Sequence, residues 1–251
     1  MRDRWLDLEG AVNVRDLGGL RTEDGRTTTD GVILRSDNLQ SLSDKDVRRL
    51  VDDLGLRTVV DLRTPAEVAG EGPGPLVEAG LRHVNLDLIP GWDPQGPRRD
   101  RVVPHEKREH NDLSHLYLTY LDEAPAAVVE ALSVLADDAT GTAVVHCAAG
   151  KDRTGVVCAL ALLCAGVERE EVVADYALTA ERIAAIRDRL AATSTYGDDM
   201  QERSLDDMRP HALSMRHFFD RLGERGGPLV WLEQNGFGPD RQAALRARLV
   251  P

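Results

Sequence analysis

Lysine is scarce in this chain of 251 residues: only Lys45, Lys107 and Lys151 are lysines, and the other basic residues are arginines. With 43 acidic against 31 basic side chains, the formal net charge is −12. Non-specific nucleic-acid binding needs lysine and arginine to neutralise phosphates, and adsorption to an anionic membrane surface depends on the same charges. The composition therefore argues against both kinds of partner, although a local basic pocket can still form within an acidic protein.

Cysteine is also rare, and the three cysteines show neither a CxxC spacing nor a Cys/His metal pattern. Cys158 and Cys164 lie in an apolar run, which predicts buried structural thiols. No disulfide framework is visible, as expected for a reducing compartment. No stretch approaches the ~20 apolar residues of a membrane span, and the first residues lack the apolar core of a signal peptide. We therefore expect a soluble, cytoplasmic protein without an integral membrane segment, while secretion by another route stays open.

Strands alternating with helices predict an α/β fold with a central, largely parallel sheet flanked by helices. The expected strands lie at 32–36, 58–62, 81–88 and 143–146. The expected helices lie at about 44–54, 113–135 with an interruption near Pro125, 154–190, and in one or two short pieces within 229–250.

No internal repeat or low-complexity linker divides the chain, and 42% hydrophobic residues can bury a sizeable core. We therefore predict a single domain over residues 1–251. Two polar segments without apolar periodicity, at about 90–111 and 193–209, are candidate lids or insertions, because long loops without structure are usually functional or disordered.

One run of ten residues, His-Cys-Ala-Ala-Gly-Lys-Asp-Arg-Thr-Gly at 146–155, joins an expected strand to an expected helix. A loop this short turns its peptide N–H groups toward a common centre, and glycine permits a backbone turn that other residues resist. The helix adds its unpaired N–H groups and the positive end of its dipole. Such a cradle binds a tetrahedral dianion without a metal or cofactor. The predicted phosphate-binding residues are Ala148, Ala149, Gly150, Lys151, Asp152, Arg153 and Thr154.

The same electric field acts on Cys147, because a helix N-terminus and a nearby cation favour a thiolate over a thiol. A thiolate beneath the bound phosphorus can attack it to give a phosphocysteine, which water then hydrolyses. The planar fork of Arg153 can bind two phosphate oxygens, and this contact strengthens in the transition state. The Thr154 hydroxyl is expected to hydrogen-bond the sulfur, and His146 to fix the loop geometry rather than transfer a proton. The run thus predicts a cysteine-dependent phosphatase.

This run resembles the protein tyrosine phosphatase superfamily, in the form His-Cys-x-x-Gly-Lys-Asp-Arg-Thr-Gly of its bacterial atypical branch. Other segments occur in the order that this branch shows, at 13–19, 34–36, 60–63, 175–176 and 232–236. The resemblance covers most of the chain and implies a tyrosine-phosphatase-like fold. It also implies a phosphorylated protein or a phosphoinositide as substrate, with phosphotyrosine first and phosphoserine or phosphothreonine as further candidates.

Ester cleavage also needs a proton for the leaving oxygen, usually from a carboxylic acid. Many family members carry that acid on a mobile Trp-Pro-Asp loop, which this sequence lacks. Asp93 has a similar setting in a different order, and Asp87 lies slightly before it. In the atypical branch the loop aspartate is a credible acid, so the resemblance favours Asp152, with Asp93 second. The helix dipole would keep Asp152 ionised, which counts against it.

Two further sets of charged residues keep alternative roles. Lys151 places a charge at the loop rim, where it could bind a second phosphate or an inositol ring, or simply lie in solvent. Five residues are expected mainly to form ion pairs that brace the strand ends beneath the loop, with a substrate-facing role for one of them as the alternative: Arg15, Asp16, Arg35, Asp61 and Arg63.

Two rival functions fit part of the pattern. A catalytically dead phosphatase that only captures phosphorylated partners has usually lost the cysteine or the arginine, and here both Cys147 and Arg153 are present. A rhodanese-type sulfurtransferase also places a cysteine in an anion-binding loop. The histidine before Cys147 and the Arg-Thr-Gly after it argue against that alternative.

Overall fold

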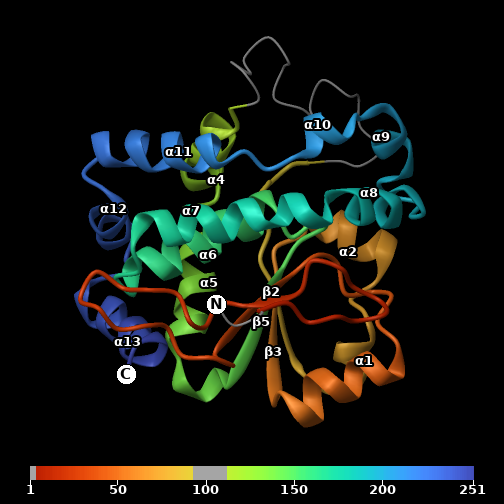
Figure 1. The fold of residues 1–251 in the computed structure, drawn as a ribbon, viewed down its shortest axis with the longest axis horizontal. Coiled ribbons are helices and arrows are strands. Elements are labelled where there is room, and N and C mark those ends of the chain that lie inside the picture. Colours follow the sequence, from red (N-terminus) through yellow and green to blue (C-terminus); the bar gives the residue numbers. More distant parts are fainter. Residues whose placement is uncertain (1–3, 93–111) are drawn as a thin grey trace.

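In residues 4–92 and 112–251, which the computed structural model describes, five strands form one mixed sheet (Figure 1). The strand order is β1-β2-β5-β3-β4, with β1 antiparallel to β2 and all other neighbours parallel. The strands are β1 (Arg15–Asp16), β2 (Ile33–Ser36), β3 (Leu56–Asp61), β4 (Arg82–Asn85) and β5 (Thr142–His146). The predicted α/β fold with a largely parallel sheet is confirmed, and the four expected strands are β2 to β5.

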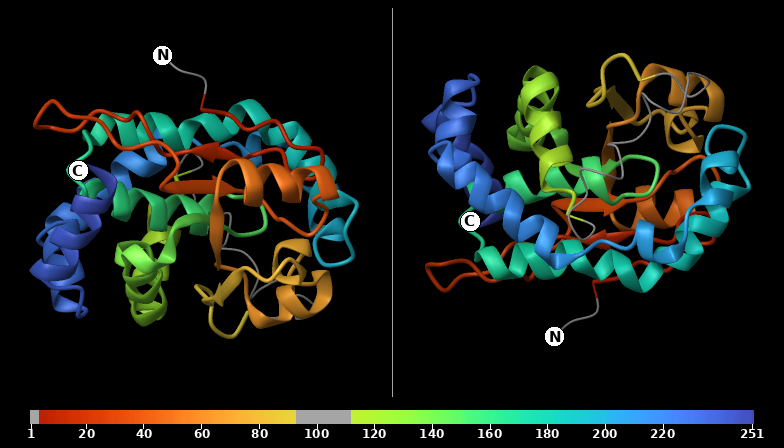
Figure 2. Two further views of the ribbon diagram at one scale, coloured as in Figure 1. Left: turned by 90° about the horizontal axis from the view of Figure 1, so that it is seen from below. Right: turned by 90° about the horizontal axis from the view of Figure 1, so that it is seen from above.

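Helices connect the strands and cover both faces of the sheet (Figure 2). They are α1 (Asp44–Arg48), which continues as a π-helical turn η1 (Arg49–Asp53), α2 (Pro65–Glu71), α3 (Pro75–Glu78), α4 (Ser114–Glu123), α5 (Pro125–Ala136), α6 (Asp152–Cys164), α7 (Arg169–Leu178), α8 (Ile183–Ala191), α9 (Gly197–Glu202), α10 (Leu205–Met208), α11 (Ala212–Glu224), α12 (Pro228–Gln234) and α13 (Pro239–Leu249), with 3₁₀ turns at Asp138–Thr140 and Thr179–Arg182. The expected break near Pro125 is confirmed, since proline there begins α5. The sequence made no prediction for α11.

Successive residues of the central strands pack on opposite faces of the sheet, as the pleat requires. Val60 and Val145 belong to the larger hydrophobic cluster, which includes residues of α4 to α7 and α11 to α13. Val59 and Val144 belong to a second cluster with residues of η1 and α3. Burial on both faces explains why these strands appear in the sequence as continuous apolar runs.

A third cluster covers the carboxyl end of β5. Ala148, two residues after this strand, packs with Ile186 of α8, Met200 of α9 and Met208 of α10. The polar segment 193–209 therefore forms two short helices that lie against the loop after β5. Helices α7 and α8 lie end to end across the molecule (Figure 1). No helix within the described residues is long and apolar enough to span a membrane.

Candidate active site

The segment 147–153, called the phosphate loop below, links β5 to α6 with its carbonyl groups turned outward. Cys147 O accepts from the His146 ring (3.2 Å), Ala148 O from Asn38 N–H (2.9 Å), Ala149 O from Asn13 Nδ2 (3.0 Å), Gly150 O from Arg35 Nη2 (2.7 Å) and Lys151 O from Gly155 N–H (2.8 Å). Within the described part of the chain, no protein group accepts from the N–H groups of residues 148–153. These donors remain for an anion bound inside the loop.

Gly150 lets the loop turn tightly against β2. Its φ is +65°, and a Cβ there would lie 2.3 Å from the carbonyl oxygen of Ser36. Both the backbone conformation and the space therefore require glycine. Because its carbonyl receives the Arg35 guanidinium, the turn is held from the outside as well.

Asp175 of α7 is the anionic centre of the support behind the loop. Arg35 Nη1 lies 2.7 Å from one of its oxygens, and Arg15 Nε and Arg4 Nη1 lie 3.1 and 2.8 Å from the other. Burial raises the pKa of Asp175, but the three guanidinium groups outweigh burial and hold this pKa well below its usual range. The bracing role predicted for Arg15 and Arg35 is confirmed. Their shared partner appeared in the sequence only as part of the family resemblance.

A second buried support lies at the end of β3. Arg63 binds the Asp61 carboxylate through Nη2 (2.6 Å) and Nε (2.8 Å), as predicted. His146 Nε2 lies 3.6 Å from Asp61 Oδ1, but burial lowers the pKa of His146 to about 4, so the ring is neutral near pH 7. Contrary to expectation, Asp16 forms no ion pair within the described residues. Its carboxylate instead accepts from the backbone N–H groups of Gly18 (2.8 Å) and Gly31 (2.7 Å), and so stabilises two backbone turns.

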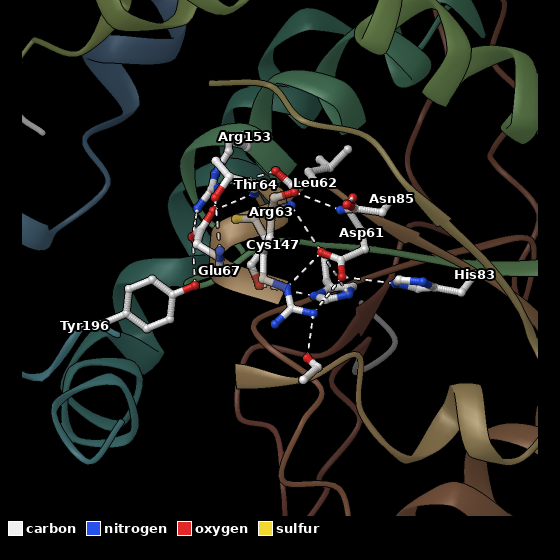
Figure 3. A network of polar contacts seen from close by, with 12 residues as sticks. Asp61, Leu62, Arg63, Thr64, Glu67, His83, Asn85, Cys147, Arg153 and Tyr196 are labelled. Atoms are coloured by element: carbon white, nitrogen blue, oxygen red, sulfur yellow. Dashed lines mark hydrogen bonds and ion pairs between the residues drawn. The ribbon is translucent and has the colours of Figure 1, made fainter. Parts of the chain in front are cut away.

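Arg153 is gripped end-on by a carboxylate that the sequence analysis missed, Glu67 of α2 (Figure 3). Nη1 lies 2.6 Å from Oε2, and Nη2 lies 2.8 Å from Oε1. Glu67 also accepts from Thr64 N–H (2.7 Å) and from the Tyr196 hydroxyl (2.7 Å). Thr64 and Glu67 form a capping box at the start of α2. That pattern is visible in the sequence, but it predicts a helix start and not a partner for Arg153.

The remaining donors of Arg153 form a fork. Nη1 also donates to Leu62 O (3.2 Å), so the protein contacts use three of the five guanidinium N–H groups. Within the described residues, the Nε–H and the second Nη2–H have no protein acceptor. These two point in parallel along one edge of the guanidinium plane, the arrangement that binds two oxygens of a phosphate at once.

Lys151 and Asp152 differ most from expectation. Lys151 is only 5% exposed and donates to the carbonyl oxygen of Met208 (2.8 Å), so the alternative of a solvated lysine at the rim is wrong, while a role in binding a second phosphate or an inositol ring stays a prediction. The helix α10 packs over it and supplies this acceptor. Asp152 begins α6, two residues before the expected helix start. Its Oδ1 accepts from the Tyr117 hydroxyl (2.8 Å), and its Oδ2 lies 3.5 Å from Lys151 Nζ.

Cys147, Lys151, Asp152 and Arg153 all line one cavity of about 340 Å³. Apolar side chains supply much of the rest of its wall: Ile89, Leu113, Leu116, Ile183, Leu190, Met200 and Met208. Cys147 itself is 3% exposed. The cavity therefore places the Cys147 sulfur, the Arg153 guanidinium and the Asp152 carboxyl group together, beside an apolar part of its wall.

The other candidates from the sequence do not join this group. The Thr154 hydroxyl is buried and has no hydrogen-bond partner among the described residues, so the bond expected to the Cys147 sulfur is absent from that part of the chain. Asp87 accepts from Ile89 N–H (2.8 Å) and is not among the described residues that line the cavity. Asp93 lies outside the described residues. Within 4–92 and 112–251, no three His, Cys, Asp or Glu side chains are placed to hold a metal ion.

A sequence model described as "Tyrosine phosphatase family" matches residues 6–251, nearly the whole chain. The chain belongs to the tyrosine phosphatase family. The predicted enzyme class is thereby confirmed: it is a phosphatase, a hydrolase of phosphoric monoesters. The bacterial relationship is also borne out by the relatives below.

Two bacterial members of the tyrosine phosphatase family show how far the similarity extends. The triple specificity protein phosphatase PtpB of Mycobacterium tuberculosis is 30% identical over 213 residues, which cover 74% of this chain and 72% of that protein. A tyrosine-protein phosphatase of Nostoc commune is 29% identical over 155 residues, or 59% of this chain. The match spans 48% of the Nostoc protein, about half of its length.

Among solved structures, the catalytic core of the PP-IP phosphatase SIW14 of S. cerevisiae aligns over 90% of this chain and 98% of its own, with 14% identity and a TM-score of 0.41. TpbA of P. aeruginosa aligns over 74% of this chain and 87% of its own, with 17% identity and a TM-score of 0.31.

Proposed function

We propose that this tyrosine phosphatase family member cleaves phosphomonoesters at the phosphate loop, with Cys147 as its nucleophile. One observation carries the proposal: the carbonyl groups of residues 147–151 all point outward to protein donors, while the N–H groups of residues 148–153 have no protein acceptor among the described residues. This arrangement suits a dianion seated above the sulfur, beside the free edge of Arg153.

The reaction follows in two displacements. Cys147 Sγ attacks phosphorus, so that an S–P bond forms while the ester P–O bond breaks, and Asp152 gives its proton to the leaving oxygen. Water then attacks the phosphocysteine and gives a proton to the Asp152 carboxylate, the S–P bond breaks to return the Cys147 thiolate, and inorganic phosphate leaves. The inward N–H groups and the Arg153 fork stabilise the charge on the three non-bridging oxygens in both steps.

For the substrate class we infer a phosphotyrosyl side chain. The apolar wall formed by residues such as Leu116 and Met200 suits an aromatic ring. An inositol headgroup with further phosphates would need additional cations near the loop. Of those that line the cavity, Lys151 is bonded to Met208 and Arg203 is paired with Asp199. The related mycobacterial protein is named a triple specificity phosphatase, so a panel of phosphotyrosine, phosphoserine and phosphoinositide substrates is the direct measure of this choice.

We further infer one phosphatase domain over residues 1–251, with the segment 193–209 as a wall of its site. The family match from residue 6 to residue 251 supports the single domain. Two contacts of the segment support its role: Tyr196 donates to Glu67, and Met208 O accepts from Lys151.

The test is phosphate release from p-nitrophenyl phosphate by wild type and by Cys147→Ser, with a chelator present in a parallel assay. We expect Cys147→Ser to lose turnover and the chelator to change nothing. The matched control is Cys158→Ser, the same change at a buried cysteine of α6 whose pKa burial raises to about 12, and it should keep turnover. Turnover that survives Cys147→Ser, or cyanide-dependent thiocyanate formation in its place, contradicts the proposal.

A further inference from the structure

The two oxygens of Asp152 lie in different surroundings. Oδ1 accepts the hydroxyl hydrogen of Tyr117 at 2.8 Å, and Oδ2 lies 3.5 Å from Lys151 Nζ. Tyr117 is fully buried on α4, whereas Asp152 stands at the first turn of α6 and is 26% exposed at its side chain. Oδ1 is thus hydrogen-bonded to a buried residue, and Oδ2 is the oxygen that remains to carry a transferable proton.

Tyr117 is itself held by a second tyrosine. Its hydroxyl hydrogen-bonds the hydroxyl of Tyr176 on α7. A phenol has one hydrogen, so if Tyr117 gives its hydrogen to Asp152, the hydrogen between the two tyrosines comes from Tyr176. Burial raises the pKa of Tyr117 well above its ordinary value, and the charge of Asp152 raises it further. Tyr117 therefore stays protonated, and remains a donor, at any pH at which the enzyme would work.

Tyr176 is seated by the last residue of the motif. A Cβ on Gly155 would lie 3.0 Å from the Tyr176 ring, so glycine at this position leaves room for the ring against α6. Asp175, the residue before Tyr176, forms an ion pair with Arg35. Arg35 in turn donates a hydrogen bond to the carbonyl oxygen of Gly150. Two adjacent residues of α7 therefore support the phosphate loop at different positions. Asp175 acts on Gly150 through Arg35, and Tyr176 acts on Asp152 through the hydroxyl of Tyr117.

We propose that Tyr117, backed by Tyr176, is a positioning residue that fixes the Asp152 carboxyl so that Oδ2 carries the proton given to the leaving group. The inference rests on the proposed function. The proton leaves Oδ2 for the ester oxygen as the P–O bond breaks, and the hydrogen bond from Tyr117 to Oδ1 stabilises the carboxylate that forms. Tyr117 touches neither substrate nor phosphorus and acts only through Asp152.

The test compares two substrates that differ in their need for a proton. Phenolate is a strong base and leaves slowly without protonation, whereas p-nitrophenolate is a much weaker base and leaves readily. For Tyr117→Phe we expect kcat on phenyl phosphate to fall about tenfold more than kcat on p-nitrophenyl phosphate, a fraction of the full effect of a general acid. In the Asp152→Asn background, Tyr117→Phe should cause no further loss, because the group it positions is gone.

Two companion variants keep the result interpretable. Tyr120→Phe removes the hydroxyl of another buried tyrosine on the same helix, one that lines the cavity but is not hydrogen-bonded to Asp152. Any loss that it causes should be equal on the two substrates, so that their ratio is unchanged. Tyr176→Phe should show a smaller loss than Tyr117→Phe, again larger on phenyl phosphate, and it serves if Tyr117→Phe does not fold. An equal loss on both substrates, or a full additional loss in the Asp152→Asn background, overturns the proposal. If either of these results is found while wild-type turnover is still lost in Cys147→Ser, the positioning role is refuted but the proposed function is not.

Discussion

Replacing Glu67 by glutamine tests whether the Glu67 carboxylate orients the Arg153 guanidinium toward the phosphate loop. Each oxygen of the Glu67 carboxylate accepts two hydrogen bonds: Oε1 from Arg153 and Tyr196, and Oε2 from Arg153 and Thr64. A glutamine amide nitrogen donates and does not accept. In either orientation of the glutamine amide, its NH₂ group replaces one of the two carboxylate oxygens. The two donors that bonded that oxygen then face another donor. The change also removes the negative partner of a buried guanidinium.

The size of the effect follows from these contacts. Removing one partner of a buried ion pair costs about 3–5 kcal/mol of stability, which for a chain of this length lowers Tm by roughly 10 °C. Arg153 would then lose the end-on grip that directs its Nε–H and Nη2–H edge into the loop. Misplacement of a binding group by about 1 Å costs on the order of 100-fold in rate. We therefore expect kcat/KM to fall about 100-fold, equivalent to about 2.7 kcal/mol of transition-state binding.

The assay is steady-state hydrolysis of p-nitrophenyl phosphate and phenyl phosphate, together with thermal unfolding of the same preparations. The kcat/KM values on the two substrates should fall equally, because Arg153 acts on the phosphate and not on the leaving group. This result distinguishes the role of Glu67 from that of Tyr117, whose loss should be larger on phenyl phosphate. The matched control is Glu71→Gln, the same change at the end of the same helix, where the carboxylate accepts only from the 194–195 turn. A folded Glu67→Gln enzyme with kcat/KM within about threefold of wild type refutes the reasoning, since misaiming should cost on the order of 100-fold.

Two further predictions concern buried ionisable groups. Asp175→Asn should lower the free energy of unfolding at pH 7 by about 3–5 kcal/mol, because Arg15 and Arg35 lose their buried partner. Since the folded pKa of Asp175 is depressed, wild type has this stability in full above pH ~4 and loses it as the pH falls. Urea unfolding should therefore show the gap between the two proteins narrowing in acid; an equal gap at pH 7 and pH 3 contradicts the account. His146, whose pKa burial lowers to about 4, should stay neutral at pH 6 in an NMR titration of its ring. Because an unfolded histidine protonates near pH ~6.5, this group withdraws stability as the pH falls from there toward 4, and ring protonation near pH 6.5 in the folded protein would falsify the assignment.

Local sequence was enough to predict the phosphate loop and the positions of four strands along the chain. The apolar runs at β2, β3 and β5 are buried on both faces, so each signal is contained in four to six neighbouring residues. The turn at Gly150 and the helix start at Asp152 are equally local. Cys147 and Arg153 are held within one loop, and their spacing alone brings them to one anion site.

The partners of those residues come from distant parts of the chain. Glu67 lies 86 residues from Arg153, and Met208 lies 57 residues from Lys151. Composition and periodicity carry no information about which buried carboxylate meets which guanidinium. The burial of Lys151, which rules out a solvated lysine at the rim, has the same origin, because α10 packs over its amine.

What the sequence determined by itself is the proposed reactive centre: a cysteine, an arginine and a ring of backbone donors between a strand and a helix. What only the tertiary structure decided is how that centre is held. The parallel order β2-β5-β3 brings the carboxyl ends of three strands to one edge. There the capping box of α2 meets Arg153, α4 brings Tyr117 to Asp152, and α7 brings Tyr176 to Tyr117. The proposed reactivity of the loop, from the first residue after β5 to the first turn of α6, follows from its own sequence. Its support depends on side chains up to 171 residues apart, which converge only when the sheet is assembled.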